Sequence, residues 1–80
     1  MKTIMLNLNS IDKVKSFVNT AVNFDFDIDL ISDNYVVNGK SILGIFSLDL
    51  AKPVEIRFHC EEPAALKAAQ EAVAPYMTEA

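Results

Sequence analysis

The chain has few of the residues on which catalysis, metal binding or covalent cross-linking usually depends. It contains one cysteine, so no internal disulfide can form, which agrees with the reducing environment of the cytoplasm. It has no glycine-rich phosphate loop, no plausible pair of catalytic carboxylates and no cluster of metal ligands. The sequence therefore argues against an independent enzyme, and we expect neither a metal nor another cofactor.

Long hydrophobic runs and an excess of positive charge are also missing. No apolar run approaches the roughly 18 residues of a membrane span, and the first residues lead into a strand pattern rather than a signal peptide. The net charge is −4, so no basic stripe can replace the counterions of nucleic-acid phosphates. We therefore expect a cytoplasmic protein that binds neither membranes nor nucleic acid directly.

The residues that are present suffice for one small domain, residues 1–80. Of the 80 residues, 51% are hydrophobic, which argues against disorder. A chain of this length buries only about 60% of its unfolded surface, so its core is small and its stability modest. No internal repeat, low-complexity tract or linker divides it.

Hydrophobic spacing predicts the element order βαββαβα. Alternation predicts strands at 3–8, 25–31, 35–37 and 54–60, and spacings of three and four predict helices at 10–23 and from 63 onward. The short helix in this order, at 42–48, is instead expected from a serine cap and from a family resemblance, both described below. The first helix is expected to stop near Asn23, a residue type that tolerates a left-handed C-terminal position. One core is expected from Phe17, Val18, Phe26, Ile28, Leu30, Ile56, Phe58, Leu66 and Val73.

Three alternating aspartates, at 25, 27 and 29, raise the question of a calcium loop. Such a loop needs glycine at its sixth position and a bidentate acid at its twelfth. These positions hold Leu30 and Val36, so we interpret the aspartates as the solvated face of a strand.

The single histidine and the single cysteine follow one another on the last predicted strand. Alternation places His59 on the exposed face, and no Ser/Asp or Cys/His arrangement is apparent beside it. It places Cys60 on the inward face, where a small core residue is more common than a reactive thiol. We expect neither side chain to carry catalysis or bind a metal.

The most informative stretch runs from Lys40 to Leu48. Ser41 stands at a helix N-cap position, where a hydroxyl accepts a backbone N–H of the first turn. The preceding Asn38-Gly39 is also a hairpin signal and would pair 35–37 with a strand at 41–46. Gly44 and the serine cap favour the helix. The apolar residues that follow are too many for one narrow stripe, so some must reach the surface and suggest a partner.

The segment Asn38–Leu48, followed by Ala51-Lys52 and Val54-Glu55-Ile56, resembles the regulatory-serine region of HPr, and the resemblance extends from about Phe17 to Ile56. HPr is the small phosphocarrier of the bacterial phosphoenolpyruvate:sugar phosphotransferase system. The resemblance implies an α+β open-faced β-sandwich, with helices on one face of a four-stranded antiparallel sheet. It implies phosphorylation at Ser41. The residues expected to bind a partner there are Lys40, Ile42, Leu43, Ile45 and Phe46.

The sequence departs from the family at Ser10. In HPr the first helix opens with a histidine that accepts phosphate, one further residue, then arginine and proline. The corresponding residues here are Ser10-Ile11-Asp12-Lys13. A serine ester lacks the transfer potential of a phosphoimidazole, and Asp12 would repel a phosphate. We therefore interpret Ser10 as a helix cap in place of the phosphoryl-accepting histidine.

Three hypotheses follow. The first is an HPr-like regulatory protein that is phosphorylated at Ser41 by HPr kinase/phosphorylase and then binds a transcriptional regulator or a phosphotransferase-system protein. The second is an HPr-like interaction module in which Ser41 is only a cap. The third is a phosphocarrier that uses a non-standard residue, or a small-molecule-binding domain of the same shape.

Overall fold

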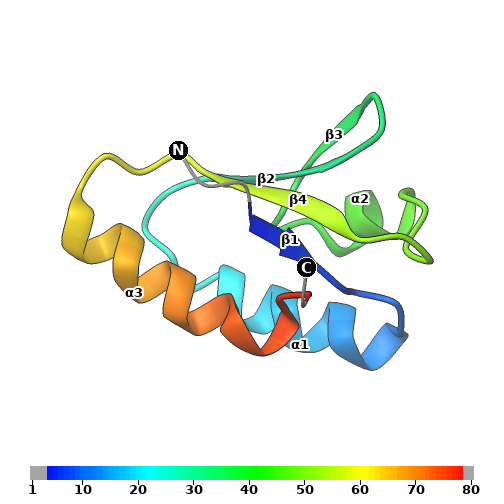
Figure 1. The fold of residues 1–80 in the computed structure, drawn as a ribbon, viewed down its shortest axis with the longest axis horizontal. Coiled ribbons are helices and arrows are strands. Elements are labelled where there is room, and N and C mark those ends of the chain that lie inside the picture. Colours follow the sequence, from blue (N-terminus) through cyan, green and yellow to red (C-terminus); the bar gives the residue numbers. More distant parts are fainter. Residues whose placement is uncertain (1–3, 79–80) are drawn as a thin grey trace.

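The computed structural model describes residues 4–78 and has the predicted order of elements (Figure 1). The elements are β1 (Ile4–Leu6), α1 (Ile11–Ala21), β2 (Ile28–Ser32), β3 (Tyr35–Asn38), α2 (Ile42–Phe46), β4 (Val54–Phe58), α3 (Pro63–Val73) and a short 3-10 helix, η1 (Ala74–Tyr76). No helix within 4–78 combines the length and the apolar character needed to cross a membrane.

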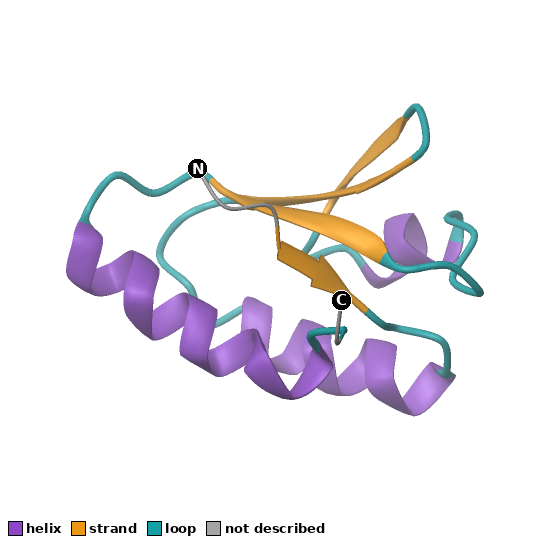
Figure 2. Ribbon diagram, viewed as in Figure 1, coloured by secondary structure: helices purple, strands orange, loops and turns teal. Residues whose placement is uncertain are grey.

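The strands form one four-stranded antiparallel sheet in the order β1-β4-β2-β3. The helices cover one face of this sheet, with α1 and α3 side by side beneath it and α2 nearer to β3 (Figure 2). The opposite face is open. This is the α+β open-faced sandwich expected from the sequence.

The core lies between the sheet and the helices. The register places Leu30 of β2 between Val37 and Ile56, and Ile4 continues this row on β1. Of the residues predicted for the core, Phe17, Ile28, Leu30, Ile56 and Val73 are buried, and Val18, Phe26 and Phe58 pack half-buried against them. Leu66 is half-buried and lies outside this cluster, so its assignment to the core was wrong.

Several predicted boundaries were too wide. β2 begins at Ile28 rather than Asp25, and β4 ends at Phe58, so Cys60 is half-exposed beyond the strand instead of in the core. The helix α1 ends at Ala21, and Asn23 is not left-handed. Within residues 4–78 the only non-glycine residue with a positive φ is Asp33, at 52°, in the turn between β2 and β3.

The backbone conformation of Gly39 shows that Asn38-Gly39 does not form a hairpin turn. Its φ is not positive, as a hairpin turn of this sequence would require. Instead it crosses closely over β2, where its N–H donates to the carbonyl of Ile28 at 2.8 Å. A Cβ at this position would lie 2.6 Å from the Cγ1 of Ile28, so the approach requires glycine.

The two edges of the sheet differ. The outer side of β1 is covered by the end of the described chain, where Leu6 bridges to Met77. The N–H of Asn7 donates to the carbonyl of Tyr76 at 2.7 Å, and the N–H of Thr78 donates to the carbonyl of Met5 at 3.0 Å. At the opposite edge, no strand within 4–78 pairs with the outer side of β3.

Candidate functional site

Ser41 forms the N-cap of α2. Its backbone is extended, with φ −101° and ψ 110°, and its Oγ accepts the N–H of Gly44 at 3.1 Å. Its carbonyl accepts the N–H of Ile45 at 3.0 Å, and its own N–H donates to the carbonyl of Asn38 at 3.0 Å. Ser41 is half-buried, so its hydroxyl is held in one direction at the start of a helix.

The helix that Ser41 caps is short and carries no charge. It ends at Phe46, two residues before the predicted end, because Ser47 closes it: the Ser47 hydroxyl donates to the carbonyl of Gly44 at 2.6 Å. No acidic residue lies in its first turn. A negative charge placed on Ser41 would therefore meet free N–H groups and no opposing carboxylate within α2.

The predicted partner-binding residues of α2 separate into an exposed and a packed group. Leu43 is 81% exposed and Phe46 is 42% exposed. Ile42 is half-buried against the core, and Ile45 is completely buried. Including Ile45 among the surface residues was therefore wrong, because its side chain anchors α2 from beneath. The apolar surface beside Ser41 is formed by Leu43 and Phe46.

Lys40 is not a free cation beside Ser41. Its Nζ donates to the carbonyl of Phe24 at 2.7 Å, in a partly buried contact. Its backbone N–H donates to Oδ1 of Asn38 at 2.8 Å. Lys40 therefore joins the segment before α2 to the loop after α1, and its ammonium group is directed to this carbonyl.

Ser10 has the same role at the start of α1. Its Oγ accepts the N–H of Lys13 at 3.1 Å, as predicted for a helix cap. The Lys13 ammonium donates to Oδ1 of Asn9 at 3.0 Å, and Asp12 lies in the first turn of the helix. Ser10 is exposed, and it is followed by an exposed apolar side chain, Ile11, and by the carboxylate of Asp12.

His59 is exposed as predicted, but it does have an acidic partner. Its Nε2 lies 2.6 Å from Oδ2 of Asp29, on the open face of the sheet. Sequence alternation placed both side chains on that face. The missing information was the β2–β4 register, which places Asp27 opposite His59 and Asp29 one step away, opposite Arg57.

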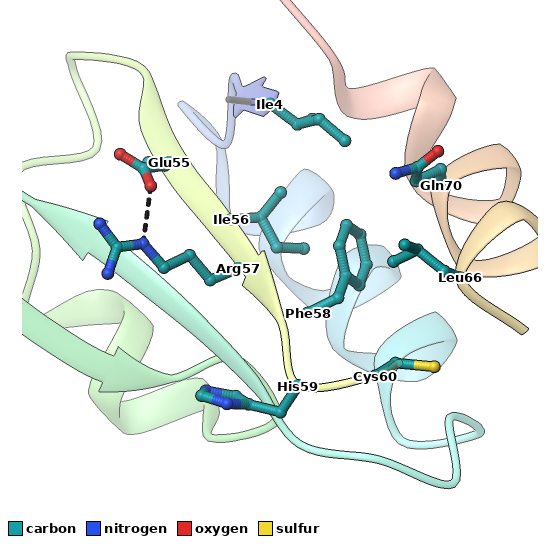
Figure 3. A pocket seen from close by; sticks show the side chains of 9 residues that line it. All are labelled: Ile4, Glu55, Ile56, Arg57, Phe58, His59, Cys60, Leu66 and Gln70. Carbon is teal, nitrogen blue, oxygen red and sulfur yellow. Dashed lines mark hydrogen bonds and ion pairs between the residues drawn. The ribbon is translucent and has the colours of Figure 1, made fainter. Parts of the chain in front are cut away.

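The remaining polar pair on this part of β4 is Arg57 with Glu55, whose Nε and Oε2 are 2.9 Å apart (Figure 3). The same view shows an apolar hollow between β4 and α3, which Phe58, Cys60 and Leu66 help to line. Within residues 4–78, no three histidine, cysteine, aspartate or glutamate side chains gather in a way that could hold a metal ion.

Comparisons with known proteins identify the family. The family model described as "PTS HPr component phosphorylation site" matches residues 13–78. The crystal structure of HPr-C-His from Thermoanaerobacter tengcongensis is 30% identical, with a TM-score of 0.69 and 91% of each chain covered. The phosphocarrier protein HPr from Bacillus anthracis str. Ames is also 30% identical, with a TM-score of 0.66 and coverage of 90% of this chain and 93% of that chain.

No curated protein matches the chain by sequence. HPr proteins are phosphocarriers rather than enzymes in the strict sense, and members of the family interact with proteins of the phosphotransferase system. The fold, the family match and the two solved structures agree. This chain belongs to the HPr family, the phosphocarrier family of the phosphotransferase system.

Proposed function

We propose that this protein is a regulatory member of the HPr family that is switched by phosphorylation of Ser41 and does not carry phosphate on histidine. One observation carries the proposal. Ser41 is an ordered, half-buried helix cap next to two exposed apolar side chains, Leu43 and Phe46. One added group on the hydroxyl would therefore change a surface that a partner can already contact.

The local charge favours a phosphate at Ser41. The modification would add about two negative charges next to the free N–H groups at the start of α2, which is a stabilising position. We expect the fold to change little. Because the Lys40 ammonium is directed to the carbonyl of Phe24, most of the compensating positive charge must come from the partner.

This arrangement specifies the kind of partner. A protein with a basic pocket beside an apolar groove would bind the phosphate and cover Leu43 and Phe46 together. The same pocket would be left with unpaired positive charge against the unmodified serine, so it would distinguish the two forms. The proposed partners are an HPr kinase/phosphorylase-like kinase and a transcriptional regulator or a protein of the phosphotransferase system.

The residues at the start of α1 argue against a carrier role. Ser10 caps the helix where the HPr resemblance places the phosphoryl-accepting histidine, and the family match begins only at residue 13. A phosphoserine ester has too little transfer potential to pass its phosphate on. Asp12 in the same turn would also repel a phosphate.

The switch is tested by incubating wild type and Ser41→Ala with HPr kinase and ATP, followed by intact-protein mass spectrometry. We expect the mass of one phosphoryl group to be added to wild type and nothing to be added to the variant. If wild type gains no mass, Ser41 is only a cap and the protein is an interaction module without this modification.

The absence of carrier activity is tested separately with enzyme I and labelled phosphoenolpyruvate. We expect no acid-labile label on the protein. The control is His59→Ala, which removes the only histidine. Stoichiometric label on wild type that disappears in His59→Ala would overturn this part of the proposal and make the His59–Asp29 pair a phosphoryl acceptor.

A further inference from the structure

The chain contains two glycines, Gly39 and Gly44, and their surroundings differ. A Cβ on Gly39 would lie 2.6 Å from Cγ1 of Ile28, so the path of the backbone over β2 requires glycine there. A Cβ on Gly44 would lie 3.4 Å from the Cβ of Val37, which is ordinary van der Waals contact. The packing of α2 against β3 therefore leaves room for a side chain at position 44.

The backbone of Gly44 and the cap of α2 do not require glycine either. The φ of Gly44 is not positive, so other residues can adopt its conformation. The cap of α1 has the same geometry with lysine at the matching position, where the N–H of Lys13 donates to Oγ of Ser10 at 3.1 Å. In the middle of a helix, glycine is less favourable than alanine. Gly44 therefore weakens α2 without being needed for its backbone or its cap.

The tightest contact at position 44 is with the hydroxyl of Ser41. A Cβ there would lie 3.3 Å from Ser41 Oγ and 3.4 Å from Ser41 Cβ. A free hydroxyl relieves such a contact by moving a few tenths of an ångström. A phosphorylated Oγ instead carries a phosphorus atom and three further oxygens, which need space beside it. A methyl group at position 44 would therefore obstruct the modified serine much more than the unmodified one.

We infer that Gly44 is a specificity-determining residue for phosphorylation of Ser41, because the missing side chain leaves the space that the transferred phosphoryl group occupies. This inference rests on the proposed phosphorylation of Ser41. In the transfer, Oγ forms a bond to the γ-phosphorus of ATP, the bond between that phosphorus and ADP breaks, and the hydroxyl proton passes to a base of the kinase. Glycine also lets the phosphate oxygens approach the N–H of residue 44, which Oγ accepts in the unmodified protein.

The first test measures the kinetics of HPr kinase and ATP on full-length wild type and Gly44→Ala. The added methyl group obstructs transfer at Oγ and leaves the exposed Leu43 and Phe46 in place, so kcat should fall by about tenfold or more, with KM little changed. The control is Ala68→Gly, the reverse exchange at an exposed position of α3, away from α2 (Figure 1). It weakens a helix at a distance from Ser41 and should be phosphorylated as fast as wild type.

The second test needs no kinase. Wild type and Gly44→Ala are prepared by chemical synthesis with phosphoserine or serine at position 41, and the midpoints of urea unfolding are compared. With serine, Gly44→Ala should be at least as stable as wild type, because alanine is the better helix former. Phosphoserine should leave the midpoint of wild type unchanged or raise it, and should lower the midpoint of Gly44→Ala.

The two tests distinguish a failure of the Ser41 switch from a failure of this inference. If the kinase modifies neither chain, the switch fails, and the synthetic phosphoserine chains decide the role of Gly44. Equal kcat values for wild type and Gly44→Ala would overturn the inference. An equal change of midpoint in the two phosphoserine chains would also overturn it. So would loss of the fold in unmodified Gly44→Ala, measured by circular dichroism, because glycine would then be structural.

Discussion

Two helices of this protein begin with a serine cap of the same geometry. Ser10 accepts the N–H of Lys13 at 3.1 Å, and Ser41 accepts the N–H of Gly44 at 3.1 Å. Their surroundings differ. Ser10 is exposed, and the first turn after it contains exposed Ile11 and the carboxylate of Asp12, whereas Ser41 is half-buried and is followed by an uncharged turn. Cap geometry alone therefore does not separate the two serines, and the regulatory role proposed for Ser41 rests on the charge and the surface around it.

The two helices also differ in how they use their apolar residues. The longer helix α1 directs Val14, Phe17 and Ala21 into the core. The short helix α2 buries only Ile45 and leaves Leu43 and Phe46 exposed. Exposed apolar side chains follow both serines, Ile11 after Ser10 and Leu43 after Ser41, but a phosphate on Ser10 would also lie beside the Asp12 carboxylate, whereas the first turn of α2 has no acidic residue.

The anchoring of α1 provides the largest expected effect. Phe17 is completely buried and meets Tyr76 edge to face, with ring centroids 5.8 Å apart. Phe17→Ala should lower the free energy of unfolding by about 3–5 kcal/mol, measured by urea denaturation. Phe58 is only half-buried, so Phe58→Ala should cost less, about 1–3 kcal/mol. An equal or larger loss for Phe58→Ala would contradict this assignment of the core.

The second effect distinguishes the buried and exposed sides of α2. Ile45→Ala removes the one completely buried side chain of the helix and should cost about 2–4 kcal/mol in the same denaturation experiment. Leu43→Ala, in the same helix but 81% exposed, should change stability by less than about 0.5 kcal/mol. Similar losses for both would mean that α2 packs differently and that Leu43 is not available to a partner.

The smallest effect is the loss of either cap. Ser10→Ala and Ser41→Ala should each lower stability by about 1 kcal/mol, because each leaves one backbone N–H without its acceptor. Aspartate at either position can accept the same hydrogen bond, so Ser10→Asp and Ser41→Asp should recover most of the loss. Thermal or urea unfolding of the four variants measures this. A much larger loss for one serine would show that the two caps are not equivalent in structure.

Local spacing and capping chemistry predicted most of the elements and the Ser41 cap, whereas the arrangement of the strands in the sheet was implied by the resemblance to HPr. The sequence did not show that the Ile45 side chain is buried, because a helix of five residues is too short for periodicity to separate a buried from an exposed face. The hydrogen bond from the Lys40 ammonium to the carbonyl of Phe24 could not be predicted from the sequence, because the two residues are 16 positions apart. The His59–Asp29 pair depended on strand register, which alternation alone does not fix.

The most direct test of the difference between the two serines is site-resolved phosphorylation in a single sample. Wild-type protein is treated with HPr kinase and ATP, and the occupancy of Ser10 and Ser41 is measured by fragment-ion mass spectrometry. The account predicts phosphate at Ser41 and none at Ser10, although both hydroxyls form the same capping bond. Equal occupancy of the two sites, or phosphate at Ser10 alone, would contradict it.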